Sequence, residues 1–208
     1  MSDSKCKRCR RQGEKLYLKG ERCYTPKCAV TRKPYAPGGR GAAARRRPKS
    51  EFGRQLSEKQ KMRFLYDVSE SQFSSYVAQA MKGKGGDAGA SLIQILESRL
   101  DNVVFRLGFS VSRSVARQLV SHGHMLVNGK RVFTASYRTR IGDVISIDPA
   151  AITTGAFGHI DIMLKKHQAP SWVTLAPEKR EGAIVSLPKV EDVVRLFNVN
   201  SIIEYYAR

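Results

Sequence analysis

The fold is decided by the segment from Glu97 to Val132, which reads ESRLDNVVFRLGFSVSRSVARQLVSHGHMLVNGKRV. Its apolar residues recur every three or four positions in two short runs, and this spacing predicts two amphipathic helices. The Asn128-Gly129 pair suits the type I′ turn of a β-hairpin. Arginines recur on the polar side of both predicted helices. The segment therefore predicts a small α/β unit with an apolar inner face and a basic outer face.

The basic outer face is expected to bind a polyanion. Arginines from two successive helices would converge if the turn between the helices is tight, and the hairpin and the next loop add further cations. A solvated helix face is the alternative, but convergent charges with few acids nearby favour a nucleic-acid surface. The expected contacts are Arg99, Arg106, Arg113, Arg117, His122, Lys130, Arg131, Tyr137, Arg138 and Arg140.

Charge is concentrated at the start of the chain. The 208 residues carry a formal net charge of +19, and residues 1–63 hold 20 Lys or Arg against 5 Asp or Glu. A basic arm beside a nearly balanced body is typical of a segment that follows a phosphate backbone. The expected contacts in this arm are Arg8, Arg10, Arg11, Arg45, Arg46, Arg47, Arg54, Lys59, Lys61 and Arg63.

A membrane partner is disfavoured, because no apolar run is long enough to span a bilayer and no signal peptide opens the chain. A cytoplasmic protein is expected. The cytoplasm is reducing, so the cysteines are not expected to form disulfides.

The four cysteines Cys6, Cys9, Cys23 and Cys28 have the spacing C-x2-C-x13-C-x4-C. Two short pairs separated by a hairpin-sized insert are typical of a structural zinc site, and an iron–sulfur cluster fits the same four sulfurs. Free thiols are the alternative. The flanking cations, such as Lys7 and Arg8, are expected to lower the pKa of the thiols and so favour metal binding.

The rest of the sequence predicts an α+β fold. Helices are expected from Leu56, after a capping box at Ser69, over 92–107 after a second capping box at Ser91, and from Ser112. The segment 82–90 is expected to be a loop, and a strand is expected at 143–148. The apolar pieces 160–164, 183–187 and 201–206 look like strands or edges that pack against the rest.

A catalytic role is disfavoured. The tripeptide Arg99-Leu100-Asp101 resembles the motif around the catalytic aspartate of RNA pseudouridine synthases, but the larger catalytic sheet and glycine-rich setting of those enzymes are missing. Asp101 falls within a predicted helix and is instead expected to form a salt link or a helix-stabilising contact. The four histidines (122, 124, 159 and 167) are scattered and are not expected to bind metal.

The whole chain resembles the universal S-four family of bacterial small-subunit ribosomal proteins. The residues that carry the resemblance are CKRCRRQGEKLYLKGERCYTPKCAV (6–30), EKQKMRFLY (58–66), ESRLDNVVFRLGF (97–109), SRSVARQLVSHGHMLVNGKRV (112–132) and IIEYYAR (202–208). The resemblance implies a mainly helical domain with a basic N-terminal metal module and an inserted module of two helices on a short antiparallel sheet. The implied division is 1–44 for the cysteine-rich module and arm, 45–96 completed by 161–208 for the helical domain, and 97–160 for the RNA-binding module.

The same resemblance implies a structural protein of the small ribosomal subunit and not an enzyme. Members bind the 5′ domain of 16S rRNA, nucleate subunit assembly and influence decoding accuracy. They lie beside ribosomal protein S-five, near the channel through which mRNA enters, and no homo-oligomer is implied. The alternative is an RNA-modifying or RNA-chaperoning factor that carries the same RNA-binding module.

Overall fold

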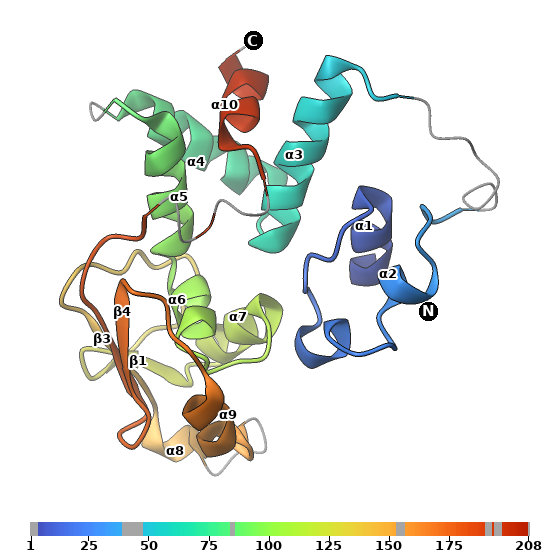
Figure 1. Ribbon diagram of the computed structural model, residues 1–208. Coiled ribbons are helices and arrows are strands. Elements are labelled where there is room, and N and C mark those ends of the chain that lie inside the picture. Colours follow the sequence, from blue (N-terminus) through green and yellow to red (C-terminus); the bar gives the residue numbers. More distant parts are fainter. Residues whose placement is uncertain are drawn as a thin grey trace.

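The computed structural model describes residues 4–38, 48–83, 86–152, 157–189, 193 and 197–207. It combines helices with one antiparallel sheet, which confirms the predicted α+β class (Figure 1). The helices are α1 (Ser4–Gln12), η1 (Gly20–Cys23, a 3₁₀ turn), α2 (Ala29–Arg32), α3 (Glu51–Leu65), α4 (Glu70–Lys82), α5 (Ala88–Glu97), α6 (Leu100–Arg106), α7 (Arg113–Ser121), α8 (Pro149–Ile152), α9 (Ile160–Lys166) and α10 (Val199–Ala207). The strands are β1 (Met125–Val127), β2 (Lys130–Arg131), β3 (Val144–Ile147), β4 (Val173–Ala176) and β5 (Glu181–Ile184). None of the described helices is long and apolar enough to cross a membrane.

Helices α3, α4, α5 and α10 pack together as a helical domain, although α10 lies at the far end of the chain (Figure 1). Its core includes the fully buried Met62, Phe73 and Ile202. Each large apolar side chain removed from water contributes about 1.5–3 kcal/mol, so α10 adds substantially to this core. The Ser69 hydroxyl accepts a hydrogen bond from the Gln72 amide at 3.3 Å, which confirms the predicted cap of α4.

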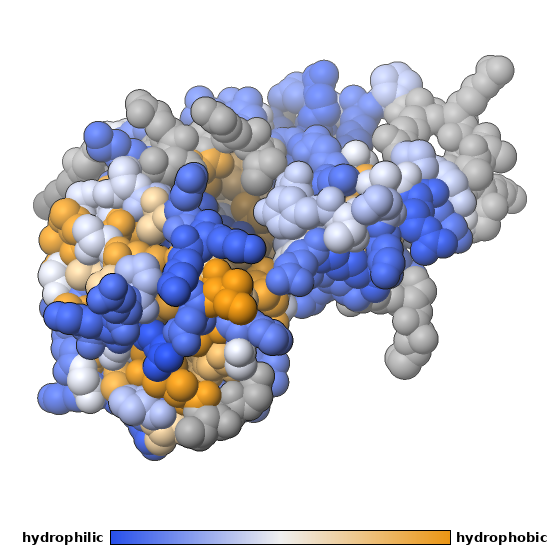
Figure 2. Space-filling model, turned by 60° about the horizontal axis from the view of Figure 1, so that its bottom comes forward, coloured by the Kyte–Doolittle hydropathy of each residue, from blue (hydrophilic) through white to orange (hydrophobic). Residues whose placement is uncertain are grey.

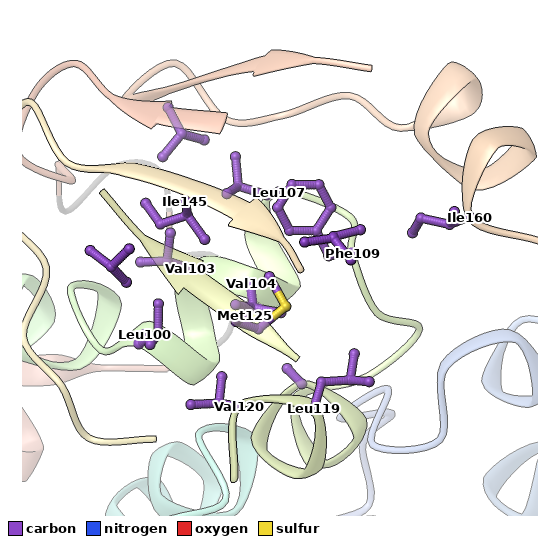
Figure 3. Close-up of a cluster of buried hydrophobic side chains, with 14 of the residues drawn as sticks. Leu100, Val103, Val104, Leu107, Phe109, Leu119, Val120, Met125, Ile145 and Ile160 are labelled. Carbon is purple, nitrogen blue, oxygen red and sulfur yellow. The ribbon is translucent and has the colours of Figure 1, made fainter. Parts of the chain in front are cut away.

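Helices α6 to α9 and the five strands form a second unit, here called the sheet domain. Side chains of α6, α7, β1 and β3 meet in its core (Figure 3). Val103 of α6, Leu107 just after it and Val120 of α7 are fully buried there, as are Met125 and Ile145 of the sheet. The apolar face predicted for the two helices is therefore confirmed.

The sheet has the strand order β2-β1-β3-β5-β4, and each neighbouring pair is antiparallel. Met125 pairs with Ile147 and Val127 with Ile145, so alternate residues of β1 and β3 face the core. Asn128 and Gly129 both have positive φ, at 50° and 77°. These angles fit a type I′ turn and confirm the predicted hairpin.

The single helix expected over 92–107 is wrong, because the chain forms α5 and α6 with a break at Arg99. Arg99 is extended (φ −68°, ψ 138°) and forms an isolated antiparallel bridge with Arg138. The Leu100 amide then donates to the Tyr137 carbonyl at 2.9 Å instead of to a helical partner. The capping box expected at Ser91 is also wrong, since Asp87 caps α5 one turn earlier.

The expected division of the C-terminal part also differs from the structure. Residues 160–164 and 201–206 lie in α9 and α10, so they are helical and not strands. Strands β4 and β5 extend the sheet, and Trp172 and Ile184 join the core of the sheet domain. The helical domain is completed only from Val193 onward, because the tail from 160 to 184 buries its apolar residues against α6 and the sheet.

Residues 4–38 form an N-terminal module that packs beside both domains. Its buried Leu16 lines a cavity with Phe64 of α3 and Phe105 of α6. Lys5 donates to the Ser114 hydroxyl, and Arg8 lies 3.5 Å from the carboxylate of Asp67. The module therefore rests against the junction between the two domains.

Replacing Gly20 with alanine is expected to loosen this N-terminal module. Gly20 has φ +59°, and an added Cβ would lie 2.4 Å from the backbone oxygen of Val111, which cannot move away as a side-chain tip can. The combined strain should lower the free energy of unfolding by about 1–3 kcal/mol. Gly142 is the matched control, since it also has positive φ (+90°) but an added Cβ meets nothing within 4 Å. Equal urea midpoints for Gly20→Ala and Gly142→Ala would contradict the expectation.

Candidate nucleic-acid interface

Arg99 does not lie on an outer face, as was predicted. Its side chain is buried, with 2% of its surface exposed. The guanidinium donates to both carboxylate oxygens of Asp101, at 3.0 and 2.6 Å, and to the Tyr76 hydroxyl at 2.6 Å. This pair confirms the salt link expected for Asp101, and it leaves that carboxylate buried and ion-paired.

Glu97 lies at the centre of a buried polar cluster that joins the two domains. Its carboxylate accepts hydrogen bonds from Tyr66 (2.6 Å), Asn102 (2.6 Å) and the Arg106 guanidinium (2.8 and 2.7 Å). Burial alone would raise the pKa of Glu97, but the charge and hydrogen bonds of Arg106 hold it below its ordinary value. Together with Arg113, these four residues are called the Glu97 cluster below.

Arg113 is held in the same cluster mainly by aromatic rings. Its Nε donates to the Asn102 side-chain oxygen at 2.8 Å, and its guanidinium lies 5.0 Å from the Tyr66 ring centroid and 4.5 Å from that of Phe105. Burial lowers the pKa of Arg113, and the nearby charge of Arg106 lowers it further. Such cation–π contacts are strongest where the cation is desolvated, as it is here.

Arg117, half-buried, donates to the Asp67 backbone carbonyl at 3.0 Å. The prediction of one outward arginine face is therefore wrong for Arg99, Arg106 and Arg113. The sequence places these three arginines opposite the core of the sheet domain, but the helical domain covers that side through Tyr66 and Tyr76. RNA binding by these arginines stays a prediction. The structure does not favour it, because Arg99 and Arg106 are paired with carboxylates and Arg113 packs against two aromatic rings.

The cations predicted on α3 are also used within the protein. Lys59 is 5% exposed and pairs with Glu70, and Arg63 lies 3.2 Å from the same carboxylate. Lys61 is 8% exposed and pairs with Glu58 of α3 at 2.8 Å and with Glu14 of the N-terminal module at 2.9 Å. These pairs connect α3 to its neighbours, so Lys59 and Lys61 are poor candidates for phosphate contacts. Arg54, by contrast, is exposed.

The predicted arginines of α1 lie closer to the surface. Arg11 is exposed, whereas Arg8 is half-buried beside Asp67. The Arg10 side chain donates to the backbone carbonyls of Lys33 and Tyr35 and so ties α1 to the end of the module. Arg45, Arg46 and Arg47 lie outside the described residues.

The segment 130–141, here called the basic loop, is the part of the predicted surface that stays open. Lys130, Arg131, Arg138 and Arg140 are all exposed, as is His122 at the end of α7. Tyr137 is 38% exposed. Of these cations, Arg131 is paired with Asp148. In Figure 2 hydrophilic side chains cover most of the lobe on the right, while the sheet domain on the left mixes hydrophilic with hydrophobic patches.

Two kinds of surface residue were not predicted from the sequence. Phe133 of the basic loop is 60% exposed, which is unusual for a phenylalanine among arginines. The segment KRVFTASYR (130–138) contains the signal, because two aromatic residues lie between basic residues in it. Lys165 and Lys166, exposed at the end of α9, were missed because that segment was expected to be a strand.

The four cysteines are free thiols that line one cavity of the N-terminal module together with apolar side chains. In the described part of the chain, however, no group of three or more His, Cys, Asp or Glu side chains is placed so that it could hold a metal ion. The metal module of the predicted fold is therefore not confirmed.

Burial and hydrogen bonds, more than nearby cations, set the pKa values of Cys9, Cys23 and Cys28. Burial raises the pKa of Cys9 and of Cys23 above the ordinary value, and the other thiols raise it further. For Cys28 burial also acts upward, but hydrogen bonds from Val30 and Thr31 bring its pKa below the ordinary value. At Cys9 and Cys23 desolvation thus outweighs the hydrogen bonds from the Leu16 and Lys19 backbone, which act downward.

The sequence matches two known families, which meet at the break between α5 and α6. Residues 1–97 match the Ribosomal protein S4/S9 N-terminal domain, and residues 98–145 match the S4 domain. Small ribosomal subunit protein uS4 of Syntrophomonas wolfei is 43% identical over 207 residues, which cover 100% of this chain and 98% of that protein. The protein of the same name from Thermus thermophilus is 47% identical over 203 residues, which cover 98% and 96%. With identity at this level along nearly the whole of both chains, this protein belongs to the uS4 family of small ribosomal subunit proteins.

Proposed function

We propose that this protein binds 16S rRNA as a structural part of the small ribosomal subunit in the bacterial cytoplasm. The observation that carries the proposal is full-length similarity to proteins named for that subunit. The exposed cations of α1 and of the basic loop support it, since a ribonucleoprotein needs open positive charge to meet phosphates. The finer expectations are binding to the 5′ domain, nucleation of assembly, and an effect on decoding accuracy beside S-five near the mRNA channel.

Binding is expected to rest on shape and phosphate contacts. The major groove of an A-form helix is too narrow for side chains to read, so a clamp of cations on a rigid frame suits duplex RNA. Arg11, Arg54, Arg138 and Arg140 are the best described candidates because their side chains are exposed. The Glu97 cluster would hold the two domains, and hence these cations, in a fixed arrangement.

Chemical footprinting of the protein on 16S rRNA tests the proposal. Protection confined to one junction of the 5′ domain is the expected result. Protection spread evenly over the rRNA, or none at a protein excess, would argue against a site-specific subunit protein. Assaying the same mixture for modified uridine tests the alternative of an RNA-modifying factor, and the buried, paired Asp101 predicts that none forms.

We also infer that the four thiols of the N-terminal module bind one structural metal ion, with zinc favoured. Four cysteines that line one cavity supply the donor set that zinc and iron–sulfur clusters share. Bound metal would cross-link α1, η1 and the start of α2, and its role there would be structural. The ion would also hold the thiols as thiolates, although burial raises the pKa of Cys9 and of Cys23.

Freshly purified protein is therefore expected to contain about one zinc ion per chain. Cys9→Ser should lower both the metal content and the melting temperature, because one of four ligands is lost. Elemental analysis distinguishes zinc from iron. Two results together would contradict a structural metal. They are a melting temperature of Cys9→Ser equal to that of the wild type, and a metal-free wild-type protein that stays folded.

A further inference from the structure

We infer that Phe133 stacks on an unpaired base of the bound RNA, an inference that rests on the proposed rRNA binding and refines it. Phe133 is 60% exposed at the surface of the sheet domain. A phenylalanine in this position leaves apolar surface in water, and covering that surface with a partner would be favourable. The nature of that partner follows from what surrounds the ring.

The surroundings of Phe133 are cationic. Lys130 and Arg131 precede it in the chain, and Arg138 and Arg140 lie farther along the same loop, all of them exposed. Lys130, Arg138 and Arg140 have no ion pair with any of the described residues. An apolar protein partner would have to bury these charges, whereas RNA supplies phosphates for the cations and a flat apolar surface for the ring.

Acidic side chains that could repel RNA are already engaged. Between residues 122 and 148 the acids are Asp143 and Asp148. Asp143 accepts from the Asn128 side chain at 2.9 Å and from the Arg140 amide at 2.8 Å, and Asp148 pairs with Arg131. The charge that the basic loop presents to solvent is therefore positive.

The frame beneath the ring is rigid. The Asp101 amide donates to the Ala135 carbonyl at 3.2 Å and the Leu100 amide to the Tyr137 carbonyl at 2.9 Å, so the start of α6 anchors the middle of the loop. The Phe133 ring itself lies against Gly123, where an added Cβ would be 2.3 Å from the ring carbon Cε1. One edge of the ring is thus seated on the end of α7 while most of its surface stays open. An ordered aromatic loses little side-chain entropy when a base stacks on it.

An unpaired base is the partner that best fits these features. Protein recognition of RNA commonly targets bases splayed from loops, bulges and junctions, which stack on aromatic rings while nearby cations hold the backbone. Tyr137, 38% exposed in the same loop, adds a second aromatic surface next to Arg138. The proposal assigns the stacking role to Phe133 because it is the more exposed of the two rings.

Phe133→Leu tests the stacking, because leucine keeps an apolar contact with Gly123 but has no π-face. We expect its Kd for a transcript of the 16S rRNA 5′ domain to rise about 5- to 100-fold, as base stacking predicts, with the salt dependence unchanged. Ile141→Ala is the matched control, since Ile141 is 56% exposed in the same loop but aliphatic, and it should bind as the wild type does. An unchanged Kd for Phe133→Leu, or an equal loss for both variants, would overturn the proposal.

Phe133→Trp provides a direct readout of stacking. Trp172, the other tryptophan, is 1% exposed, so a change in emission on RNA binding would report position 133. Quenching on addition of the 5′-domain transcript is expected, and unquenched emission with RNA bound at normal affinity would overturn the proposal. If wild type fails to bind the transcript at all, the proposed function fails instead, so the two failures are distinguishable.

Discussion

Glu97→Gln is expected to lower the free energy of unfolding by about 3–5 kcal/mol, the usual loss when one partner of a buried ion pair is removed. Glu97 has no exposed surface and accepts hydrogen bonds from Tyr66, Asn102 and Arg106. Glutamine keeps the shape but replaces one accepting oxygen with a donor and leaves the charge of Arg106 without its partner. Urea unfolding of the purified full-length variant measures the loss.

Asp161→Asn is the control for Glu97→Gln. Asp161 pairs with Arg180 through two hydrogen bonds of 2.8 and 2.9 Å, as Glu97 does with Arg106, but the Asp161 pair is exposed. Water screens such a pair, and its removal should leave the urea midpoint nearly unchanged. Equal losses of unfolding free energy in both variants would mean that the burial of the Glu97 cluster does not strengthen its contribution to stability.

The contribution of Glu97 to the free energy of unfolding should also decrease in acid. Its pKa in the folded protein lies below the ordinary value of 4.5, so its contribution is present above pH 4.5 and is lost as the pH falls through the folded-state pKa. The gap in stability between wild type and Glu97→Gln should therefore narrow on acidification below pH 4.5. A gap that widens as the pH falls toward 4.5 would instead show that the folded-state pKa of Glu97 lies above its ordinary value.

Affinity for the 16S rRNA 5′-domain transcript is expected to fall by about 10³- to 10⁵-fold between 50 and 200 mM salt if about six to ten phosphates are neutralised. This expectation rests on the concentration of positive charge before residue 64 and on the exposed cations of the basic loop. Filter binding at several salt concentrations gives the slope. A flat profile would exclude a clamp based on phosphate contacts.

Single substitutions can show which cations carry that salt dependence. Arg138→Ala should reduce the slope of log K against log salt by about one, because one phosphate contact is lost. Lys61→Met should leave the slope unchanged, since Lys61 is 8% exposed and pairs with Glu14 and Glu58. The opposite pattern would place the RNA on α3 instead of on the basic loop.

Local features were predictable from the sequence, and contacts between distant segments were not. The Asn128-Gly129 turn, the Ser69 cap and the apolar face of α7 depend on residues within a few positions of one another, and all three predictions are confirmed. Family membership likewise confirms the expectation of a ribosomal protein and not an enzyme.

The arginines of α6 show where prediction from sequence failed. Their periodicity correctly places them opposite the core of the sheet domain, but a helix has two sides that can be covered. The second cover comes from Tyr66 and Tyr76, more than twenty positions earlier in the chain, and periodicity within α6 carries no information about them. The sequence did contain one signal for these ion pairs, because an acid, Glu97, stands close to Arg99 and Arg106 in it.

The position of α10 in the helical domain has a consequence for the order of folding during synthesis. Residues that complete the sheet domain end at Ile184, whereas Val199 and Ile202 complete the core around α3, α4 and α5. A nascent chain can therefore close the sheet domain while the earlier helical segment still lacks its last apolar side chains. The part of the chain made second can thus be finished first, before the last helix docks on α3, α4 and α5.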